Sequence, residues 1–402
     1  MHMNNNKTAL VPRLRFPEFA INGAINFETG DVIFEPISNK NHNSDLPVLA
    51  ITQEHGAIPR DQIDYNVSVT DKSLESYKVV EIGDFIISLR SFQGGIEYSL
   101  YHGICSPAYI ILRKRVPIVD QYYKHYFKTG RFIKDLNKDL EGIRDGKMVS
   151  YRQFSAIMLP KPDRKEQQKI ADCLSSIDDL IAAEDKKLEA LGAHKRGLMQ
   201  KLFPAEGKTL PEWRFPEFRG SGEWVISPLS EVCENLDSRR IPITEKDRKK
   251  GFTPYYGASG IVDYVDGFIF DEVLLCVSED GANLVARTYP IAFSISGKTW
   301  VNNHAHVLKF QNSNTQVMVK NYINSINLED FLTGMAQPKL NRAKLDIIPI
   351  PLPSEKEQQK IADCLSSIDD LIAGQVKKLE ALRTHKKGLM QGLFPSIEEV
   401  GE

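Results

Sequence analysis

The 402-residue sequence has only five cysteines, and none of them stands in a CxxC pair. An odd number without that spacing predicts neither a disulfide framework nor a cysteine zinc site. The chain also lacks an apolar run of the length that a membrane helix needs, and its start shows no secretory signal. These absences favour a soluble, cytoplasmic protein that does not contact a membrane.

An excess of one charge sign is missing as well. The chain has 51 Lys and Arg against 53 Asp and Glu, which gives a net charge of −2. This balance excludes a histone-like surface, so any contact with nucleic acid has to come from local basic clusters. Such clusters occur at 113–115, 124–138, 239–240 and 246–250. Each is more often a solvated face than a binding site, and the charge alone leaves the partner open.

Motifs of catalysis and cofactor binding are absent too. The sequence has no GxxxxGK(S/T) phosphate loop, no glycine-rich dinucleotide fingerprint and no Asn/Asp-Pro-Pro-Tyr/Phe motif. His304 and His306 could ligate a metal from one strand face, but no cysteine or carboxylate cluster accompanies them, which favours a structural role. We therefore expect no catalytic residue and no metal in this chain.

What the sequence does have is a long repeat. Residues 166–182 recur without change at 357–373, and between 166–204 and 357–395 only seven positions differ. A repeat of this kind decides the architecture. It predicts two half-molecules in tandem, each a variable region followed by one long helix.

The repeated segment has the pattern of a coiled coil. Apolar residues follow a 4-3-4-3 spacing over more than four heptads in both copies. Polar residues interrupt this seam at Glu184, Lys195, Gln375 and Lys386, which favours a defined register. The apolar seam positions are Ile170, Leu174, Ile177, Ile181, Leu188, Leu191, Leu198, Leu202, Ile361, Leu365, Ile368, Ile372, Leu379, Leu382, Leu389 and Leu393.

Start and stop signals frame each helix. Asp163-x-x-Glu166 and Ser354-x-x-Glu357 are predicted to be capping boxes, and prolines at 204 and 395 end the helices. About 39 residues at about 1.5 Å each make a rod of about 58 Å. Because one helix cannot bury an apolar stripe alone, equal length and similar ends favour an antiparallel pair within the chain. A trimeric or intermolecular coiled coil is the alternative.

The regions before the helices are predicted to be α+β domains. Their strand-like segments are rich in Val, Ile, Phe and Tyr and are bounded by Gly, Pro, Asn and Asp. Strands are expected at 46–51, 85–89, 108–112, 261–265, 273–277, 291–295 and 306–310, and helices at 120–140 and 316–332. The expected division is 1–158 for the first domain, 159–204 for the central helix, 205–349 for the second domain, 350–395 for the C-terminal helix and 396–402 for a tail.

The two domains share their openings but little else. Residues 12–19 match 211–218, and the sequences then diverge almost completely. Near-identical helices indicate one surface that does the same job twice, whereas divergent domains on the same frame indicate the same kind of job on different targets. Recombination of the helix segments would explain the identity without function, and it stays open.

With these features the chain resembles the specificity subunits of type I restriction-modification systems. The likeness spans the whole chain and rests on the order of domains and helices, the Glu-Gln-Gln-Lys-Ile-Ala start, the Ile-Asp-Asp-Leu-Ile middle and the Gly-Leu-Met-Gln-x-Leu-Phe-Pro end of both repeats. The Arg-Phe-Pro-Glu-Phe openings at Arg15 and Arg214 fit as well. The resemblance implies two target recognition domains, each reading one half of a split, asymmetric sequence in double-stranded DNA. It also implies an antiparallel helix pair, arranged about an approximate twofold axis, that separates these domains and docks two methyltransferase subunits.

The same resemblance implies that the chain is not itself an enzyme. Adenine methylation from S-adenosylmethionine and ATP-dependent DNA cleavage would belong to the methyltransferase and restriction/translocase partner subunits. Those subunits, not this chain, would bind S-adenosylmethionine, ATP and Mg²⁺.

Side chains near loop tips are the candidates for DNA contact, because Arg and Lys can bond guanine edges while Asn and Gln can bond adenine. In the first domain the polar turn 90–95 is favoured, since its glycines permit a close backbone approach. The candidates are Lys72, Ser73, Arg90, Ser91, Gln93, Arg144, Lys147, Tyr151 and Arg152 in the first domain, and Tyr255, Tyr256, Ser259, Lys298, Asn302, Asn303, Gln337, Lys339, Asn341 and Arg342 in the second.

Two other classes of protein compete with a DNA-recognition scaffold. A coiled-coil adaptor whose two α+β domains bind proteins fits the neutral charge equally well. Such an adaptor would not retain DNA, whereas a DNA-recognition scaffold should bind a duplex at low salt and release it steeply as the salt concentration rises. A self-sufficient nuclease or methyltransferase lacks the motifs that such enzymes need.

Overall fold

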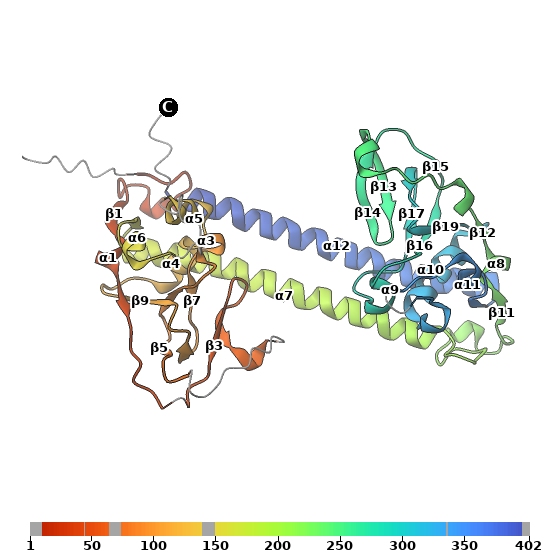
Figure 1. The fold of residues 1–402 in the computed structure, drawn as a ribbon, viewed down its shortest axis with the longest axis horizontal. Helices are drawn as coiled ribbons and strands as arrows, with labels where there is room; N and C mark the ends of the chain where they lie inside the picture. The colour runs from red at the N-terminus through yellow and green to blue at the C-terminus, as the bar shows by residue number, and fades with distance from the viewer. Residues whose placement is uncertain (1–9, 44, 64–73, 139–148, 335–336, 396–402) are drawn as a thin grey trace, which may run out of the picture. The chain divides into compact units, whose positions relative to one another are not determined.

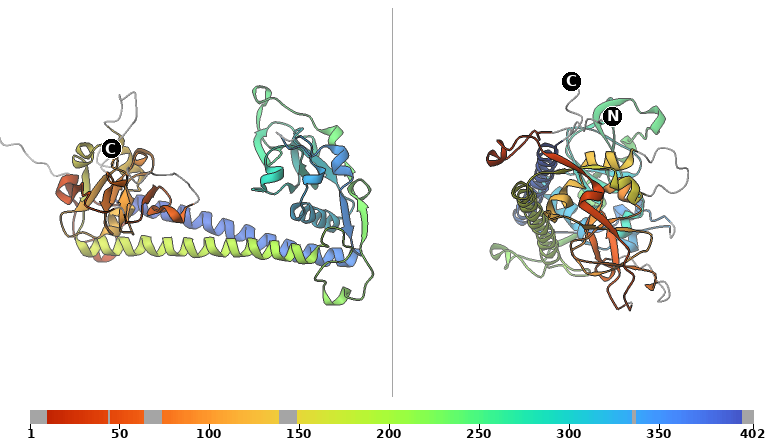
Figure 2. Two further views of the ribbon diagram at one scale, coloured as in Figure 1. Left: turned by 60° about the horizontal axis from the view of Figure 1, so that its bottom comes forward. Right: turned by 90° about the vertical axis from the view of Figure 1, so that its left-hand side faces the viewer.

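The computed structural model describes residues 10–43, 45–63, 74–138, 149–334 and 337–395 (Figure 1). The chain divides into two compact units, the first made of residues 1–184 and 378–402, and the second of residues 185–377. Both repeats contribute to both units. Each unit therefore holds one variable domain, the start of the long helix that follows it and the end of the other long helix (Figure 2). Within the described part of the chain, no helix is both long and apolar enough to cross a membrane.

The first unit is built on a four-stranded antiparallel sheet with an aromatic core. The sheet order is β2 (Phe34–Ile37), β9 (Ile110–Lys114), β6 (Phe85–Ile87) and β7 (Glu97–Tyr98). The Phe34 ring lies 5.4 Å from the rings of Phe85 and Tyr123, edge to face, so the sheet and the helix that carries Tyr123 share one core.

Short helices and ribbons surround that sheet. The helices are α1 (Gly30–Ile33), α3 (Ser91–Gly94), α4 (Asp120–Tyr126), α5 (Gly130–Asn137) and α6 (Tyr151–Ser155). The two-stranded ribbons are β1 (Asn26–Thr29) with β10 (Met158–Lys161), β3 (Leu49–Thr52) with β4 (Gly56–Pro59), and β5 (Lys78–Val80) with β8 (Gly103–Cys105).

The second unit has two four-stranded sheets. The buried main sheet runs β12 (Glu234–Asn235), β19 (Ala305–Lys309), β16 (Leu274–Ser278) and β17 (Ala292–Ile295). The second sheet runs β14 (Gly260–Val265), β13 (Lys250–Gly257), β18 (Lys298–Val301) and β15 (Phe270–Asp271), and within it β13 and β18 are parallel. A ribbon of β11 (Val225–Pro228) and β20 (Pro349–Leu352) and the helices α8 (Leu229–Val232), α9 (Asn283–Ala286), α10 (Ser313–Ser325) and α11 (Arg342–Asp346) complete it.

The observed strands begin within three residues of the expected positions, but the helix expected over 120–140 is interrupted. It is α4 and α5, separated where Thr129 accepts the backbone NH of Phe132 at 3.2 Å and so caps α5. Apolar residues keep their spacing across this break, which is why the pattern predicted one helix. The helix expected over 316–332 is α10, which ends at Ser325, followed by a 3₁₀ turn at Glu329–Phe331.

The two long helices have the predicted ends. The first, α7, spans Arg164–Leu202 and the second, α12, spans Glu355–Leu393, so each stops two residues before its proline. At their starts, the reciprocal capping box is not formed in the described residues. Asp163 does accept the backbone NH of Glu166 at 3.0 Å, but the Glu166 carboxylate is taken by two hydrogen bonds from Arg15, of 2.7 and 2.8 Å.

The second helix repeats this arrangement. Arg214 donates two hydrogen bonds of 2.7 Å to the carboxylate of Glu357, which is buried like Glu166. The two arginines come from the matching Arg-Phe-Pro-Glu-Phe openings. Each opening is therefore bound to the start of the helix that follows its own domain, by a two-pronged charged contact.

The predicted antiparallel pairing of the two helices is confirmed in each unit (Figure 1). In the first unit Leu174 of α7 shares a core with Leu393 of α12, and in the second unit Leu365 of α12 shares a core with Leu202 of α7. The start of one helix thus packs against the end of the other. None of the seam positions is fully exposed, and most of the buried ones lie near the helix ends, where the domains also pack, although Leu379 in the interior of α12 is buried too.

One ion pair occurs twice in this helix pair, at equivalent repeat positions. Lys386 of α12 binds Asp178 of α7 in the first unit, and Lys195 of α7 binds Asp369 of α12 at 2.5 Å in the second. The two lysines are among the polar residues that interrupt the apolar seam. Their bonds cross between the helices, so they fix the register of the pair.

Each ion pair has one further neighbouring side chain, and this neighbour differs between the two units because it comes from the variable domain. In the first unit His125 of α4 lies 3.8 Å from the Asp178 carboxylate and 3.3 Å from the Ser175 hydroxyl. In the second, Lys320 of α10 lies 3.2 Å from Asp369. The helices therefore offer one acidic contact twice, and each domain meets it with its own side chain.

This difference predicts that acid weakens the first unit through His125. Burial, and then the charge of Lys386, lower the pKa of His125 to about 4. The Asp178 carboxylate acts in the opposite direction, but it offsets only part of this lowering. Since the ring in the unfolded chain titrates near 6.5, the stability that the neutral ring provides is present above that pH and is lost as the pH falls toward 4. Lys124 is the other charge that lowers the pKa.

We expect the free energy of unfolding of the His125→Gln protein to fall less between about pH 7 and about pH 5 than that of the natural chain. Urea unfolding at both pH values measures this difference. The control is Lys320→Gln in the second unit, which removes no group that titrates in this range and should leave the pH dependence unchanged. Equal pH dependence in the natural and His125→Gln proteins would contradict the prediction.

Candidate nucleic-acid interface

Three loops of the second unit meet at one edge of its main sheet. They are the loops that contain residues 279–281, 302–304 and 337–341. Backbone hydrogen bonds join them: the Leu340 NH donates to the Glu279 carbonyl at 2.8 Å, and the Glu279 NH donates to the His304 carbonyl at 2.9 Å. These loops, which lie far apart in the sequence, therefore form one surface.

The turn of the β13–β14 hairpin reaches the same place. The Asn302 NH donates to the Tyr256 carbonyl at 3.0 Å, and the Ser278 hydroxyl donates to the Ala258 carbonyl. We call this surface the polar edge and define it by its exposed residues, which are Ser259, Asn303, His304, Gln337 and Lys339.

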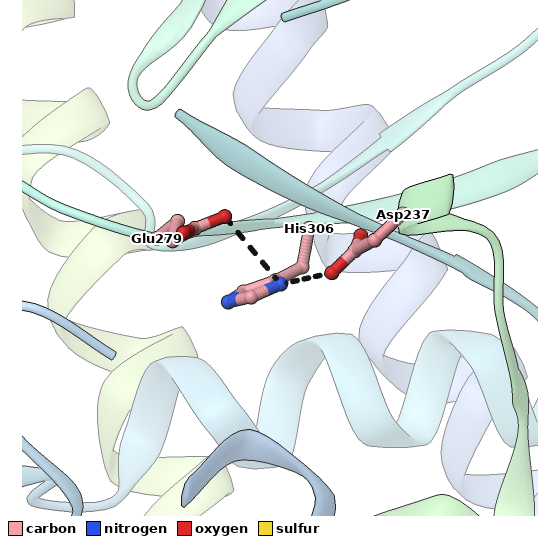
Figure 3. Close-up of side chains that lie close together, drawn as sticks. All are labelled: Asp237, Glu279 and His306. Carbon is pink, nitrogen blue, oxygen red and sulfur yellow. Dashed lines mark hydrogen bonds and ion pairs between the residues drawn. The ribbon is translucent and has the colours of Figure 1, made fainter. Parts of the chain in front are cut away.

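A buried ion network lies behind the polar edge, centred on His306 (Figure 3). Nδ1 of His306 lies 2.6 Å from the Asp237 carboxylate, and Nε2 lies 2.7 Å from the Leu340 carbonyl. Both ring nitrogens therefore face oxygen atoms, one of a carboxylate and the other of a backbone carbonyl. Burial raises the pKa of Asp237, but His306, the Val307 NH and Arg240 together outweigh burial, and that pKa lies below its usual range.

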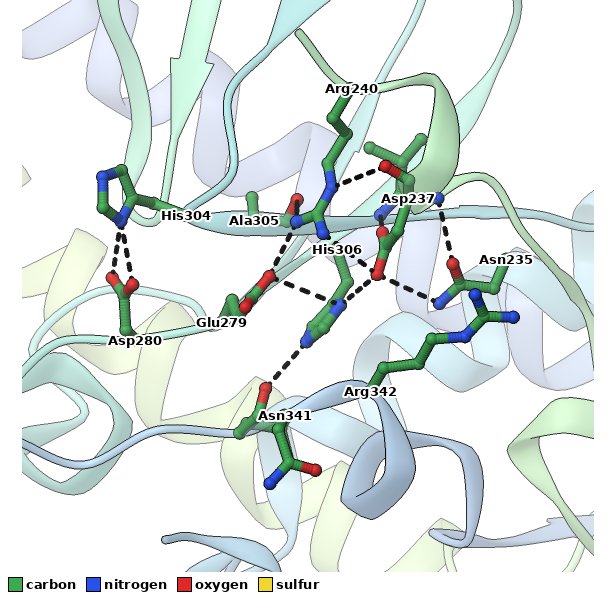
Figure 4. A network of polar contacts seen from close by, with 12 residues as sticks. Asn235, Asp237, Arg240, Glu279, Asp280, His304, Ala305, His306, Asn341 and Arg342 are labelled. Carbon is green, nitrogen blue, oxygen red and sulfur yellow. Dashed lines mark hydrogen bonds and ion pairs between the residues drawn. The ribbon is translucent and has the colours of Figure 1, made fainter. Parts of the chain in front are cut away.

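Arg240 completes the network (Figure 4). Its guanidinium donates to the Glu279 carboxylate at 2.7 Å and to the Ala305 carbonyl at 2.8 Å, and it lies 3.4 Å from Asp237. Lys339 reaches Glu279 from the polar edge at 3.1 Å. Through these contacts the network fixes the backbone on which the loop residues stand.

The same cluster has the spacing of a metal site, because ligand atoms of Asp237, Glu279 and His306 all lie within 4.8 Å of one another. Its chemistry fits a metal poorly. A metal needs a free imidazole nitrogen, whereas both nitrogens of His306 already contact oxygen atoms of Asp237 and Leu340, and Arg240 supplies positive charge to both carboxylates. His304 turns to a different partner, Asp280, at 2.8 Å, so the two histidines do not converge (Figure 4).

The structure brings many of the predicted second-domain residues to this edge and removes others from it. Asn302 is buried and accepts the His304 NH at 2.8 Å, and Asn341 caps α11, so both position loops. Tyr255 is a correction: it is buried, and its hydroxyl accepts the Ile243 NH at 2.9 Å, so it cannot reach a ligand. Lys298 lies over the Phe268 ring instead, 4.8 Å away.

Tyr256 and Arg342 keep part of their surface at or near the edge. Tyr256 is half-buried and stacks on Phe293 with 6.0 Å between the ring centroids. Arg342 is exposed at the start of α11 and lies 3.5 Å from Asp346 one turn later.

In the first unit, the predicted polar turn is one turn of helix, α3. Arg90 and Gln93 are exposed there, but Ser91 is buried and its hydroxyl oxygen accepts the Ser88 NH at 2.8 Å, which corrects its candidacy as a DNA contact. Gly95 has a φ of +81°, and a Cβ on it would lie 2.0 Å from the Phe127 carbonyl oxygen. The lack of a side chain at Gly95 thus lets its backbone lie close to the Phe127 backbone of the same unit.

The remaining first-domain candidates are scattered. The Tyr151 hydroxyl donates to the Phe34 carbonyl at 3.1 Å, which is a structural bond, and Arg152 is exposed on α6. The others lie outside the described residues, and they are Lys72, Ser73, Arg144 and Lys147.

A wide groove in the first unit adds residues that were not singled out as candidates. It has a volume of about 1060 Å³ and is lined by parts of α4, α5, the β3–β4 turn and the end of α12. Seven Lys and Arg line it against three Asp and Glu, although the whole chain is slightly acidic. The basic residues that line it are Arg13, Lys124, Lys128, Arg131, Arg383, Lys386 and Lys387.

The turn with Arg90 borders this groove. Gln53, a lining residue, donates to the Arg90 carbonyl at 3.4 Å, and Lys128 donates to the Gly94 carbonyl at 3.0 Å. The sequence contained one signal for it, the basic cluster 124–138, but the α12 residues lie about 250 positions further on and only the fold brings them there.

Comparison with protein families agrees with this architecture. The family model described as "Type I restriction modification DNA specificity domain" matches residues 17–193 and again residues 221–383. The chain belongs to this family. The prediction that it is a specificity subunit and not an enzyme is confirmed by this assignment and by the names of its relatives.

Two relatives show how far the likeness extends. The MjaVIII type I restriction enzyme specificity subunit of Methanocaldococcus jannaschii is 26% identical over 365 residues, which cover 82% of this chain and 81% of that protein. S.HindORF215P of Haemophilus influenzae, whose name assigns it provisionally to the same class, is 35% identical over 149 residues, or 37% of this chain and 38% of that protein.

Solved structures share the fold. A type I restriction-modification S subunit from M. genitalium is 15% identical with a TM-score of 0.60, covering 96% of this chain and all of that one. A chain from a study of the assembly of a type I restriction-modification system is 14% identical with a TM-score of 0.54, covering 92% of this chain and 97% of that one.

Proposed function

We propose that this chain recognises a two-part, asymmetric sequence in double-stranded DNA, one part per variable domain, and docks two methyltransferase subunits on its repeated helices. Adenine methylation from S-adenosylmethionine, and ATP- and Mg²⁺-dependent cleavage where restriction subunits join the complex, would be carried out by those partners. The chain would determine the DNA sequence at which those partners act.

The contrast between the constant and the variable parts carries this proposal. The helix pair presents the same contact twice, with Lys386 on Asp178 and Lys195 on Asp369, whereas the domain residues that meet it differ. Near-identical helices suit two copies of one partner subunit. Domains with different surfaces suit two different half-sites, because base readout depends on which side chains reach the groove.

The exposed residues of the two units suit DNA in two different ways. The polar edge of the second unit presents an Asn, a Gln and a Lys on loops fixed by the ion network, which is the chemistry of base readout. The groove of the first unit presents an excess of Lys and Arg, which is the chemistry of phosphate contact. Both suit a nucleic-acid partner despite the net charge of −2.

The helices offer an equivalent docking point in each repeat. Leu180 and Leu371 occupy the same repeat position, and they are 42% and 60% exposed although they are leucines within the coiled-coil segments. Because they are exposed at the same position of both repeats, they offer two equivalent apolar contacts to a partner. Two copies of one methyltransferase subunit would each cover one of them.

Mapping of methylated adenines in cells with and without this gene tests the recognition proposal. We expect an asymmetric two-part motif to lose methylation when the gene is absent. The double variant Asn303→Ala/Gln337→Ala should relax base preference in one half of that motif only, since each lost base contact is worth about 1–3 kcal/mol. Gln311→Ala, an exposed glutamine outside the polar edge, is the matched control and should leave the motif intact.

Purified chain with its methyltransferase partner gives the independent check. It should retain a duplex that carries the mapped motif and lose it steeply as the salt concentration rises. A methylome that does not change with the gene, or a complex that retains no duplex at low salt, would contradict the proposed function.

A further inference from the structure

Phe252 of β13 is almost entirely exposed among the residues that the structure describes. Its side chain is 99% exposed, the largest exposed fraction among the large apolar side chains of the described residues. Because the ring stays in water, it gains no free energy from burial and does not stabilise the fold. Because the ring packs on almost nothing within the described residues, it is available to contact a partner.

The backbone around Phe252 is built to project it. Val265 of β14 pairs with both Lys250 and Thr253, so Gly251 and Phe252 form a bulge in the hairpin. A Cβ at position 251 would lie 2.3 Å from the Val265 carbonyl oxygen, which restricts that position to glycine. β-Bulges redirect side chains, and this one directs Phe252 into solvent.

The base of the hairpin is held firmly. The Asp266 NH donates to the Lys249 carbonyl at 2.9 Å and closes the hairpin next to the bulge. The Arg248 guanidinium lies 4.7 Å from the centre of the Tyr255 ring and 3.2 Å from the Asp263 carboxylate. Because these contacts order the backbone in advance, binding through Phe252 costs little conformational entropy.

The charges beside Phe252 suit a phosphate backbone. Residues 245–250 contain four basic and two acidic side chains, and Lys246, Lys249 and Lys250 are exposed. None of these three lysines forms an ion pair with another described residue. The hairpin also reaches the polar edge at its turn: Tyr256, four residues after Phe252 on β13, accepts the Asn302 NH there.

We propose that Phe252 is a wedge which the second domain inserts between adjacent base pairs, in or beside the half-site that the polar edge reads. This inference rests on the proposed DNA recognition. Apolar side chains inserted in this way unstack one base step and kink the duplex, and the neighbouring lysines would hold the phosphates on either side. The wedge would add recognition of a deformable step to the hydrogen-bond readout of the polar edge.

The experiment uses the complex of this chain with its methyltransferase partner and a duplex with the mapped motif. Fluorescent dyes at the two ends report bending, and 2-aminopurine at successive adenines of the half-site reports unstacking. We expect the natural complex to bend the duplex and to raise the 2-aminopurine signal at one step. Phe252→Ala should abolish both signals and weaken binding roughly tenfold to hundredfold, as expected for a lost base–aromatic contact. Phe252→Leu, which keeps an apolar wedge, should retain both signals.

Ile21→Ala is the matched control, because Ile21 of the first unit is 91% exposed and lies far from the hairpin in sequence. It should change neither bending nor affinity. If Phe252→Ala binds and bends the duplex like the natural chain, the wedge is wrong while the proposed function stands. If Phe252→Ala instead loses the methyltransferase subunit, the residue is a protein contact and the wedge is wrong. If the natural complex binds no duplex, the proposed function itself fails.

Discussion

Deletion of residues 184–190 together with 375–381 is expected to move methylation to a motif whose unread spacer is about three base pairs shorter. Seven residues of helix span about 10.5 Å, and DNA rises about 3.4 Å per base pair. The two deletions remove equivalent heptads, so the apolar seam of each helix keeps its spacing. The ion pairs of Asp178 and Asp369 lie outside the deleted segments and are kept.

This result depends on helix length acting as the ruler for the distance between the half-sites. Methylome mapping of cells that carry the doubly shortened chain measures it, and methylation of the original motif should be lost. The matched control removes 184–190 alone, which leaves helices of unequal length and should abolish methylation without creating a new motif. Unchanged methylation of the original motif by the doubly shortened chain would refute the ruler.

The features that the sequence predicted well are those that repeat locally. The apolar period and the prolines marked the C-terminal ends of α7 and α12 to within two residues, because a helix of this length contains many independent copies of the same signal. The duplicated segments then predicted the antiparallel pairing. The two halves are also alike in a way that the sequence pattern did not show. Arg15 and Arg214 bind the starts of the two helices through the same kind of contact.

The features that were missed depend on contacts between distant residues. Glu166 fits a capping box when only its neighbours are seen, but Arg15, 151 positions earlier, takes its carboxylate. Ser91 and Tyr255 have side chains that suit a surface, yet the fold buries both. Residue type alone cannot separate a hydroxyl that meets a ligand from one that satisfies a buried backbone group.

The candidate site shows the same division. The sequence identified Asn303, Gln337 and Lys339 as polar loop residues, and the fold places them on one edge. It gave no indication that the ring of His306 stands behind that edge between Asp237 and Leu340, because such a network exists only once three separated segments have met. Local chemistry thus predicts which residues can read a ligand, and tertiary contacts decide which of them do.

The substitution Leu180→Glu/Leu371→Glu is expected to abolish assembly with the methyltransferase subunit and, with it, methylation in the cell. Both leucines are exposed, so the chain itself should fold and melt as before. A buried carboxylate in an apolar interface costs several kcal/mol unless it is paired, which is enough to break a docking contact. Because the repeat offers two equivalent points, each single substitution should remove one of two bound subunits, and native mass spectrometry of the complexes counts them.

The chain provides a matched control within the same invariant segment. Ala182→Glu/Ala373→Glu introduces the same two carboxylates at exposed positions two residues further along, about 200° around each helix from the leucines. These proteins should still bind two subunits. If the leucine variants assemble normally, or if the alanine variants fail equally, the docking point does not lie at Leu180 and Leu371. Loss of both subunits on a single leucine substitution would show instead that the two repeats do not bind independently, and that the partner reads the helix pair as one surface.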